Sequence, residues 1–128
     1  MRKLLQLSLV YPVRPYSTWR RAGDLVIVSG QLGTIPGSDP LTFADGAAGQ
    51  LRQALANAKL LLEEANSSLS DVVKATMFVI ELSEFAALNE VWLETFSDPL
   101  PTRSAFAVAG LPYDAKVEVE FWAYSPER

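Results

Sequence analysis

The chain is predicted to fold as an α+β protein, with a mixed β-sheet of about six strands and two helices packed on one face of that sheet. Segments with the alternating pattern of strands are interrupted twice by segments in which apolar residues recur at helical spacing. One strand segment separates the two helices, an order typical of a βαβ-like crossover. The length of 128 residues is that of one domain with a single modest core, so residues 1–128 are interpreted as a single domain.

Composition restricts the chemistry available to this domain. The chain contains no cysteine and no histidine, which excludes disulfides, thiolate nucleophiles, imidazole bases and Cys/His zinc sites. Acid–base chemistry is therefore left to Glu, Asp, Lys, Tyr, backbone groups or water. The net charge of −4 argues against a general nucleic-acid binder.

The first segment, residues 3–9, is predicted to be an edge strand because its leucines alternate. It resembles a signal peptide only faintly, since Gln6 and Ser8 interrupt a short apolar run and no small-residue cleavage site follows. No segment is long enough to span a membrane. We expect a cytoplasmic protein.

A β-hairpin is predicted next, from Thr18–Ala22 and Leu25–Ser29, with Gly23-Asp24 as its two-residue turn. A proline-containing loop precedes it. The second strand ends in Ser29-Gly30-Gln31, a polar exit at which backbone N–H groups could face a ligand. A surface loop, 33–40, follows it.

Two helices are predicted, one on each side of a central strand that covers residues 72–82. The first covers residues 43–65, with Thr42 as its cap and Asn66 in the left-handed position after its end. The second covers residues 84–96, with Ser83 as its cap. Its predicted buried stripe consists of Phe85, Leu88, Trp92 and Phe96.

The last two strands are predicted at residues 103–108 and 116–124, joined by a turn that contains Gly110 and Leu111-Pro112. Strict alternation divides the final strand into two faces. Two carboxylates, Glu118 and Glu120, lie about 7 Å apart on one of them. Like charges in a partly buried place raise each other's pKa unless a cation compensates. That face also carries Trp122 and Tyr124, and the other carries Val117, Val119, Phe121 and Ala123.

Arg103 begins the strand before these carboxylates and is the nearest obvious cation in sequence. An arginine that faces a carboxylate on an adjacent strand can be a structural ion pair. It can also be an anion site, with the guanidinium bidentate on a substrate carboxylate and a glutamate beside it handling protons or water. Spacing alone does not choose between these interpretations.

The ordered motifs of the chain resemble the Rid family (YjgF/RidA-like imine/enamine deaminases). The resemblance extends from about Arg14 to Tyr124, and its most specific part is Pro101-x-Arg103-Ser104 followed by Leu111-Pro112 and Val117-Glu118. The other motifs are Pro15-Tyr16-Ser17, Val28-Ser29-Gly30-Gln31, the helix with Asn57, the strand that begins at Val72, and Phe85-Ala-Ala-Leu-Asn89.

The resemblance implies a chorismate-mutase-like fold and a homotrimer with clefts between subunits. It implies a hydrolase of the 2-iminobutanoate/2-iminopropanoate deaminase type, which converts reactive 2-imino or 2-enamino acids into 2-oxo acids and ammonia. Such imines leak from pyridoxal-phosphate enzymes and would otherwise damage them. By position, Arg103 would bind the substrate carboxylate and Glu118 would position water. Tyr16, Ser29, Gly30 and Asn89 would line or shape the cleft.

This chemistry needs an anion clamp and a polar group that orients water, so no metal and no cofactor are expected. The partners expected are a small-molecule substrate and further copies of the chain, with neither nucleic acid nor membrane. The sequence departs from the family pattern in two places. Ala105 stands where many members have cysteine, and the segment between Asn89 and Arg103 looks a few residues short.

Other functions remain open at this stage. The main alternative is a non-catalytic trimer whose clefts bind a small carboxylate metabolite, which would also use Arg103. RNA cleavage is a third hypothesis, and the acidic net charge counts against it. A chorismate-mutase activity is suggested by fold analogy alone.

Overall fold

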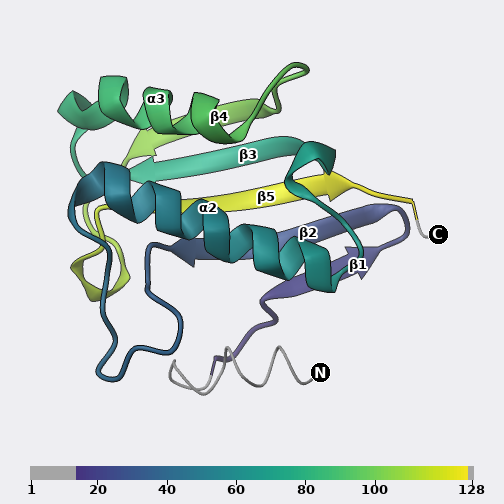
Figure 1. The fold of residues 1–128 in the computed structure, drawn as a ribbon, viewed down its shortest axis with the longest axis horizontal. Helices are drawn as coiled ribbons and strands as arrows, with labels where there is room; N and C mark the ends of the chain where they lie inside the picture. The colour runs from purple at the N-terminus through teal and green to yellow at the C-terminus, as the bar shows by residue number, and fades with distance from the viewer. Residues whose placement is uncertain (1–13, 127–128) are drawn as a thin grey trace.

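The computed structural model describes residues 14–126, which form one five-stranded sheet and two α-helices (Figure 1). The strand predicted at residues 3–9 lies outside the described range. Three 3₁₀ turns, Leu69–Asp71, Leu82–Glu84 and Pro112–Asp114, complete the described elements. The strands and helices are β1 (Trp19–Ala22), β2 (Leu25–Leu32), α2 (Gly46–Glu64), β3 (Val72–Val79), α3 (Phe85–Thr95), β4 (Thr102–Ala107) and β5 (Val117–Tyr124).

The sheet is mixed and has the strand order β1-β2-β5-β3-β4. β3 and β4 are parallel and are joined through α3, which confirms the predicted crossover. The pairs β1–β2, β2–β5 and β3–β5 are antiparallel. The predicted Gly23-Asp24 turn closes the first hairpin, and Gly23 has the positive φ of 59° that such a turn requires.

Both helices pack on one face of the sheet, as predicted, and Figure 1 shows α2 and α3 on the same side of it. The two helices contribute different side chains to the core. α2 contributes leucines and alanines, and α3 contributes Leu88 and Trp92. Burial of apolar surface between these layers is the main stabilising contribution. β5 supplies four of its residues to this core: Val117, Val119, Phe121 and Ala123.

The opposite face of β5 carries the predicted second set of side chains. Glu118 and Glu120 are half-buried there, whereas Trp122 and Tyr124 are 45% and 53% exposed. No helix of the described residues covers this face. We call it the open face of the sheet.

The last two strands, predicted to be joined by a turn, are not neighbours in the sheet. β3 lies between β4 and β5, and the segment Val108–Lys116 carries the chain across the end of β3. A turn signal such as Leu111-Pro112 shows where a chain changes direction but does not show which strand it joins next. The backbone N–H of Val108 is hydrogen-bonded to the Val79 carbonyl, which keeps the start of this segment beside β3.

Element ends also differ from the predictions. α2 begins at Gly46 and Thr42 does not cap it, because Phe43 is still paired with Thr34 in a β-bridge. Asn66 has a φ of 61°, which confirms its predicted left-handed position.

β3 ends at Val79 rather than near residue 82, because Leu82–Glu84 already forms the 3₁₀ turn that leads into α3. Ser83 lies inside this turn, and the residue at the N-cap of α3 is Glu84. No helix of the described residues has the length and apolar character needed to cross a bilayer.

Candidate functional site

Arg103 lies on the helix-covered face of the sheet. It is level with Ala75 of β3, a residue with no exposed surface beneath the helices. Its guanidinium carbon is 5.0 Å from the ring centroid of Trp92, and its Nη2 donates a hydrogen bond of 2.9 Å to Asn89 Oδ1. α3 therefore supplies both residues that hold the arginine side chain.

Arg103 is half-buried, and this burial lowers the pKa of its guanidinium below the usual value. Arginine remains charged nonetheless, because its ordinary pKa lies far above physiological pH. Within residues 14–126 the arginine forms no ion pair with a carboxylate. Spacing left open a structural ion pair between Arg103 and a carboxylate of an adjacent strand, and the described residues do not form it.

Glu118 lies on the open face of the sheet, opposite Leu32 of β2 and Phe78 of β3. Partial burial raises the pKa of its carboxyl group, and the negative charge of Glu120 raises it further. The effect of Glu120 on Glu118 is the one expected of a like charge on the same strand face. A carboxyl group with a raised pKa binds a proton more readily than an ordinary glutamate does.

Gly30 provides the space for the Glu118 carboxyl group. A Cβ atom built at Gly30 would lie 2.8 Å from Glu118 Cδ and would overlap Oε2. The strand does not end here as predicted. Instead, β2 contains a bulge between Val28 and Gln31 and continues to Leu32.

The side chain of Gln31 holds the bulge, and sequence reasoning missed this role. Its Nε2 donates hydrogen bonds to the carbonyls of Ser29 and Gly30, at 3.1 and 3.3 Å. Ser29 is tied to the preceding loop, since its Oγ donates to the Ser17 carbonyl at 2.6 Å. These bonds bring the loop that contains Tyr16 beside the bulge.

A pocket of about 320 Å³ lies between the β2 bulge, Glu118 and the loop that contains Tyr16. Three predicted site residues, Tyr16, Gly30 and Glu118, line it, and Ser29 lies next to it in the bulge. Tyr113 also lines it and was not predicted as a site residue. The other lining residues are Arg14, Pro15, Gln31, Leu32, Thr34 and Pro112.

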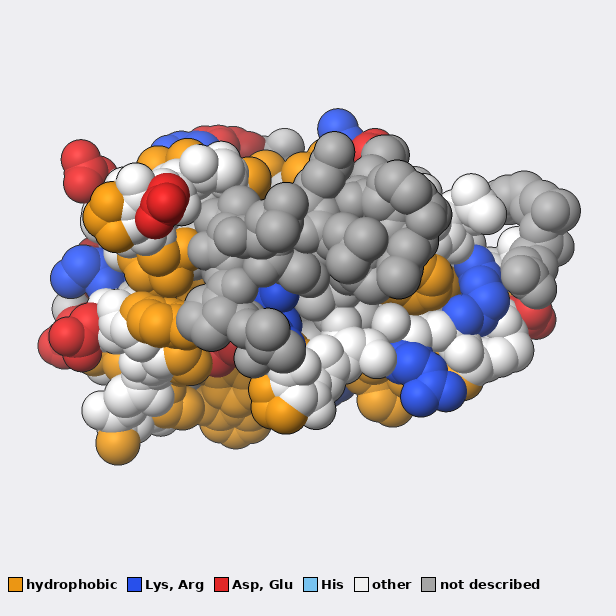
Figure 2. Space-filling view, turned by 90° about the horizontal axis from the view of Figure 1, so that it is seen from below, with side chains coloured by type: hydrophobic (Ala, Val, Ile, Leu, Met, Phe, Trp, Pro, Cys, Tyr) orange, Lys and Arg blue, Asp and Glu red, His pale blue; other side chains and the backbone are white. Residues whose placement is uncertain are grey.

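Figure 2 shows hydrophobic side chains crowded at the left end of the molecule. Figure 1 places two loops at that end, the one after β2 and the one before β5. Tyr113 belongs to the second of these loops and is 58% exposed. Most of the apolar lining of the pocket is made by loops, Leu32 lies at the end of β2, and the acidic Glu118 belongs to β5.

The predicted site residues fall into two groups within one chain. Tyr16, Gly30 and Glu118 line the pocket, whereas Asn89 and Arg103 lie together between α3 and β4. β3 separates β4 from β5, and Arg103 and Glu118 point to opposite faces of the sheet. Ala105 is on the same face as Arg103 and packs against the core.

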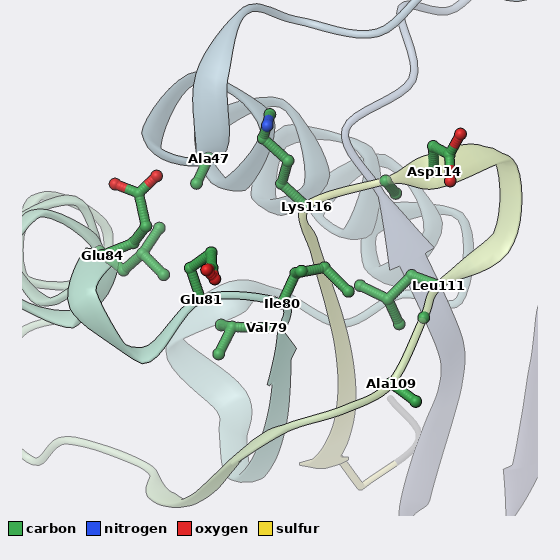
Figure 3. A pocket seen from close by; sticks show the side chains of 12 residues that line it. Ala47, Val79, Ile80, Glu81, Glu84, Ala109, Leu111, Asp114 and Lys116 are labelled. Carbon is green, nitrogen blue, oxygen red and sulfur yellow. The ribbon is translucent and has the colours of Figure 1, made fainter.

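A second pocket, of about 190 Å³, lies on the other side of the loop before β5 (Figure 3). Ala109, Leu111 and Lys116 of this loop line it, together with Glu81 and Glu84 from the segment that precedes α3. None of the predicted site residues lines it. No cluster of His, Cys, Asp or Glu that could hold a metal occurs in the described part of the chain.

Comparison with known proteins shows extensive similarity. A family model described as Endoribonuclease L-PSP matches residues 7–125. A RutC family protein of Pyrococcus horikoshii is 38% identical over 113 residues, which cover 88% of this chain and 89% of the relative. A 2-iminobutanoate/2-iminopropanoate deaminase of Dermatophagoides farinae is 36% identical over 109 residues, with coverage of 85% and 84%.

The fold also matches solved structures. The crystal structure of RidA from an Antarctic Psychrobacter is similar with a TM-score of 0.83 and 39% sequence identity. The match covers 89% of this chain and 91% of that one. Identity at this level, over almost the full length of both chains, is sufficient to assign a family.

Proposed function

The chain belongs to the YjgF/RidA family, and we propose that it hydrolyses 2-imino and 2-enamino acids to 2-oxo acids and ammonia. The family includes proteins named as imine deaminases. The observation that carries the proposal for this chain is that the side chains of Arg103 and Glu118 are each held in place by neighbouring residues. Arg103 is held by Asn89 and Trp92 without a carboxylate partner in the described residues, and Glu118 lies over Gly30 in a pocket.

The active assembly is proposed to be a homotrimer in which the two groups of residues come from neighbouring copies. The separation of Arg103 and Glu118 on opposite faces of one sheet supports this, since no single chain brings them together. The exposed aromatic side chains of the open face also support it. Trp122, Tyr124 and Phe106 are about half exposed, and burial of such surface against another copy is favourable.

In the proposed reaction, the guanidinium of Arg103 binds the substrate carboxylate with two parallel hydrogen bonds. Asn89 Oδ1 accepts a bond from one Nη atom and so limits the orientation of the guanidinium plane. This fixes the position of the neighbouring imine carbon.

Glu118 is proposed to accept a proton from water as the water oxygen bonds to the carbon of the imine, whose nitrogen is protonated. The resulting carbinolamine then breaks its C–N bond. Its hydroxyl proton is released, the nitrogen leaves as ammonia with the proton returned by Glu118, and a 2-oxo acid remains. Burial and Glu120 raise the pKa of Glu118, which favours its return of the proton. The step needs no group beyond these side chains and water.

Imine hydrolysis is the direct test. An amino-acid oxidase generates 2-imino acids, and semicarbazide traps those that remain. We expect the wild-type protein to suppress trapping and Arg103→Ala to lose this effect. Arg52→Ala is the matched control, because Arg52 is an exposed arginine paired with Glu94 on the helices, and it should behave as wild type. If the wild-type protein fails to suppress trapping of every imine tested, the proposal is contradicted.

The same variants separate the main alternative, a non-catalytic metabolite-binding protein. This alternative predicts that small 2-oxo acids bind in a manner that depends on Arg103, and that no imine is hydrolysed. We further propose that residues 1–128 form one cytoplasmic domain that acts on small molecules and does not bind nucleic acid. The net charge of −4 supports the last point, and RNA binding that weakens steeply with salt would contradict it.

A further inference from the structure

The loop before β5 has an unusual backbone. Tyr113 has φ 58° and ψ 28°, and Asp114 has φ 57°, so two successive residues other than glycine are left-handed. This conformation is sterically unfavourable for side chains with a Cβ atom. Such outliers persist only where the surroundings hold them, and they gather at functional sites.

The conformation places the Tyr113 side chain at the pocket that contains Glu118. Its ring lies 6.4 Å from that of Phe43, with an interplanar angle of 47°. Phe43 is itself held by its β-bridge to Thr34, and the flanking backbone bonds Ile35 N–Thr42 O and Ala44 N–Gly33 O are 2.8 and 3.0 Å long. The ring of Tyr113 therefore rests on a fixed support although much of it is exposed.

The chemistry of the substrate assigns a role to this wall. An imine carbon of a 2-imino acid carries a carboxylate, a nitrogen and a side chain. In the proposed function the carboxylate goes to Arg103 and water to Glu118. Five of the remaining lining residues are apolar or aromatic, namely Pro15, Tyr16, Leu32, Pro112 and Tyr113, and they lie beside the polar Arg14, Gln31 and Thr34.

We propose that Tyr113 is a specificity-determining residue, and that the protein prefers 2-imino acids with aromatic or large apolar side chains to those with small ones. This inference rests on the proposed function. The flat ring of Tyr113 contacts the substrate side chain, and Phe43 supports it from behind. The pocket volume of about 320 Å³ is sufficient for such a side chain.

The test compares wild type with Tyr113→Asn and Tyr113→Phe. Asparagine accepts the left-handed backbone, so Tyr113→Asn removes the ring without disturbing the loop. Tyr113→Phe keeps the ring and is the matched control. For each protein, kcat/KM is measured with the imines made from alanine, leucine and phenylalanine. Binding of phenylpyruvate and pyruvate is measured by calorimetry on the same samples.

Wild type is expected to prefer the phenylalanine-derived imine to the alanine-derived one. Tyr113→Asn should reduce this preference roughly tenfold, and Tyr113→Phe should retain it within about twofold. A wild type that prefers the small imine, or a preference unchanged in Tyr113→Asn, overturns the inference.

Failure of the proposed function has a different signature, the absence of turnover for every imine in wild type. The binding data then decide the inference separately. Tighter binding of phenylpyruvate than of pyruvate, lost in Tyr113→Asn, supports it. Equal binding of the two acids, or a preference that survives in Tyr113→Asn, overturns it.

Discussion

At Glu118, burial and a neighbouring carboxylate act on the same proton. The side chain is half-buried over Gly30, and Glu120 lies two residues further along the same strand face. Both raise the pKa of Glu118, burial more than Glu120. Arg103 has the opposite relation to its surroundings, since Trp92 and Asn89 hold it in place without neutralising its charge. Each proposed catalytic group is thus prepared by its own neighbours.

The pH dependence of activity follows from the Glu118 environment. In the proposed mechanism activity requires the carboxylate form of Glu118, so kcat/KM should fall as pH decreases through a pKa above the ordinary value of a glutamate. Glu120→Gln removes one cause of the raised pKa and should move this acid limb to lower pH. The measurement is a pH profile of kcat/KM for each protein.

Glu63→Gln is the control for this shift, because Glu63 is an exposed carboxylate on α2. Its acid limb should coincide with that of wild type. An acid limb that stays in place in Glu120→Gln would show that Glu118 is not the group whose titration limits activity.

The bulge in β2 is the element on which the site depends. It occurs between Val28 and Gln31, where β2 loses its regular register with β5. The glycine within it leaves room for the carboxyl group of Glu118, and the Gln31 side chain holds the two bulge carbonyls. A regular strand at this place would present a different set of side chains to β5.

Gly30→Ala tests the role of this element. Its Cβ would meet the end of the flexible Glu118 side chain, so the carboxyl group should move while the fold remains. Displacement of a catalytic group by about 1 Å can reduce a rate about a hundredfold. We expect a loss of kcat/KM of this order, with the melting temperature close to that of wild type.

Gly110→Ala is the matched control, because a Cβ at Gly110 has no atom within 4 Å. It should retain both activity and stability. Full activity of Gly30→Ala would mean that the position of Glu118 over this glycine is not needed.

At the scale of the whole molecule, the sheet separates the two proposed catalytic groups. Arg103 lies beneath α3 on one face, and Glu118 lies on the other, with β3 between their strands. The open face also carries exposed aromatic side chains that no described helix covers. A second copy of the chain accounts for both observations, since it would complete the site and bury that surface.

Subunit mixing provides a specific test of a shared site. Arg103→Ala and Glu118→Gln should each be inactive alone. Refolded together in equal amounts, they should regain about a quarter of wild-type activity, because that share of sites would combine an intact arginine with an intact glutamate. The measurement is imine hydrolysis before and after mixing.

Each variant refolded alone is the control and should remain inactive. Mixed assemblies can be verified with a tag on one variant. If they form but stay inactive, Arg103 and Glu118 do not act across a subunit boundary.

Much of the fold could be predicted because its signals are local. The structure confirmed that buried and more exposed side chains alternate along Val117–Tyr124. It also confirmed the Gly23-Asp24 turn and the left-handed conformation of Asn66. The helix ends were less accurate, since Phe43 pairs with Thr34 rather than joining α2. That pairing depends on a residue in another segment, which helical spacing does not reveal.

Motif resemblance proposes residues for the candidate site but says nothing of their arrangement. Motif resemblance indicated Arg103, Glu118, Tyr16, Ser29, Gly30 and Asn89, and the structure shows where each lies. It did not indicate Tyr113, whose place at the pocket depends on a backbone conformation that tyrosine rarely adopts. Nor did it indicate Gln31, which holds the bulge through bonds visible only in the folded strand.

The main elements, the two faces of β5 and the family could be predicted from the sequence, because periodicity, turn residues and ordered motifs are properties of short segments. The folded chain was needed to show that β3 separates β4 from β5, that Arg103 and Glu118 point to opposite faces, and that Glu118 lies over Gly30. Strand order and register arise from contacts between residues far apart in the chain. They depend on how the whole sheet buries its apolar face against α2 and α3.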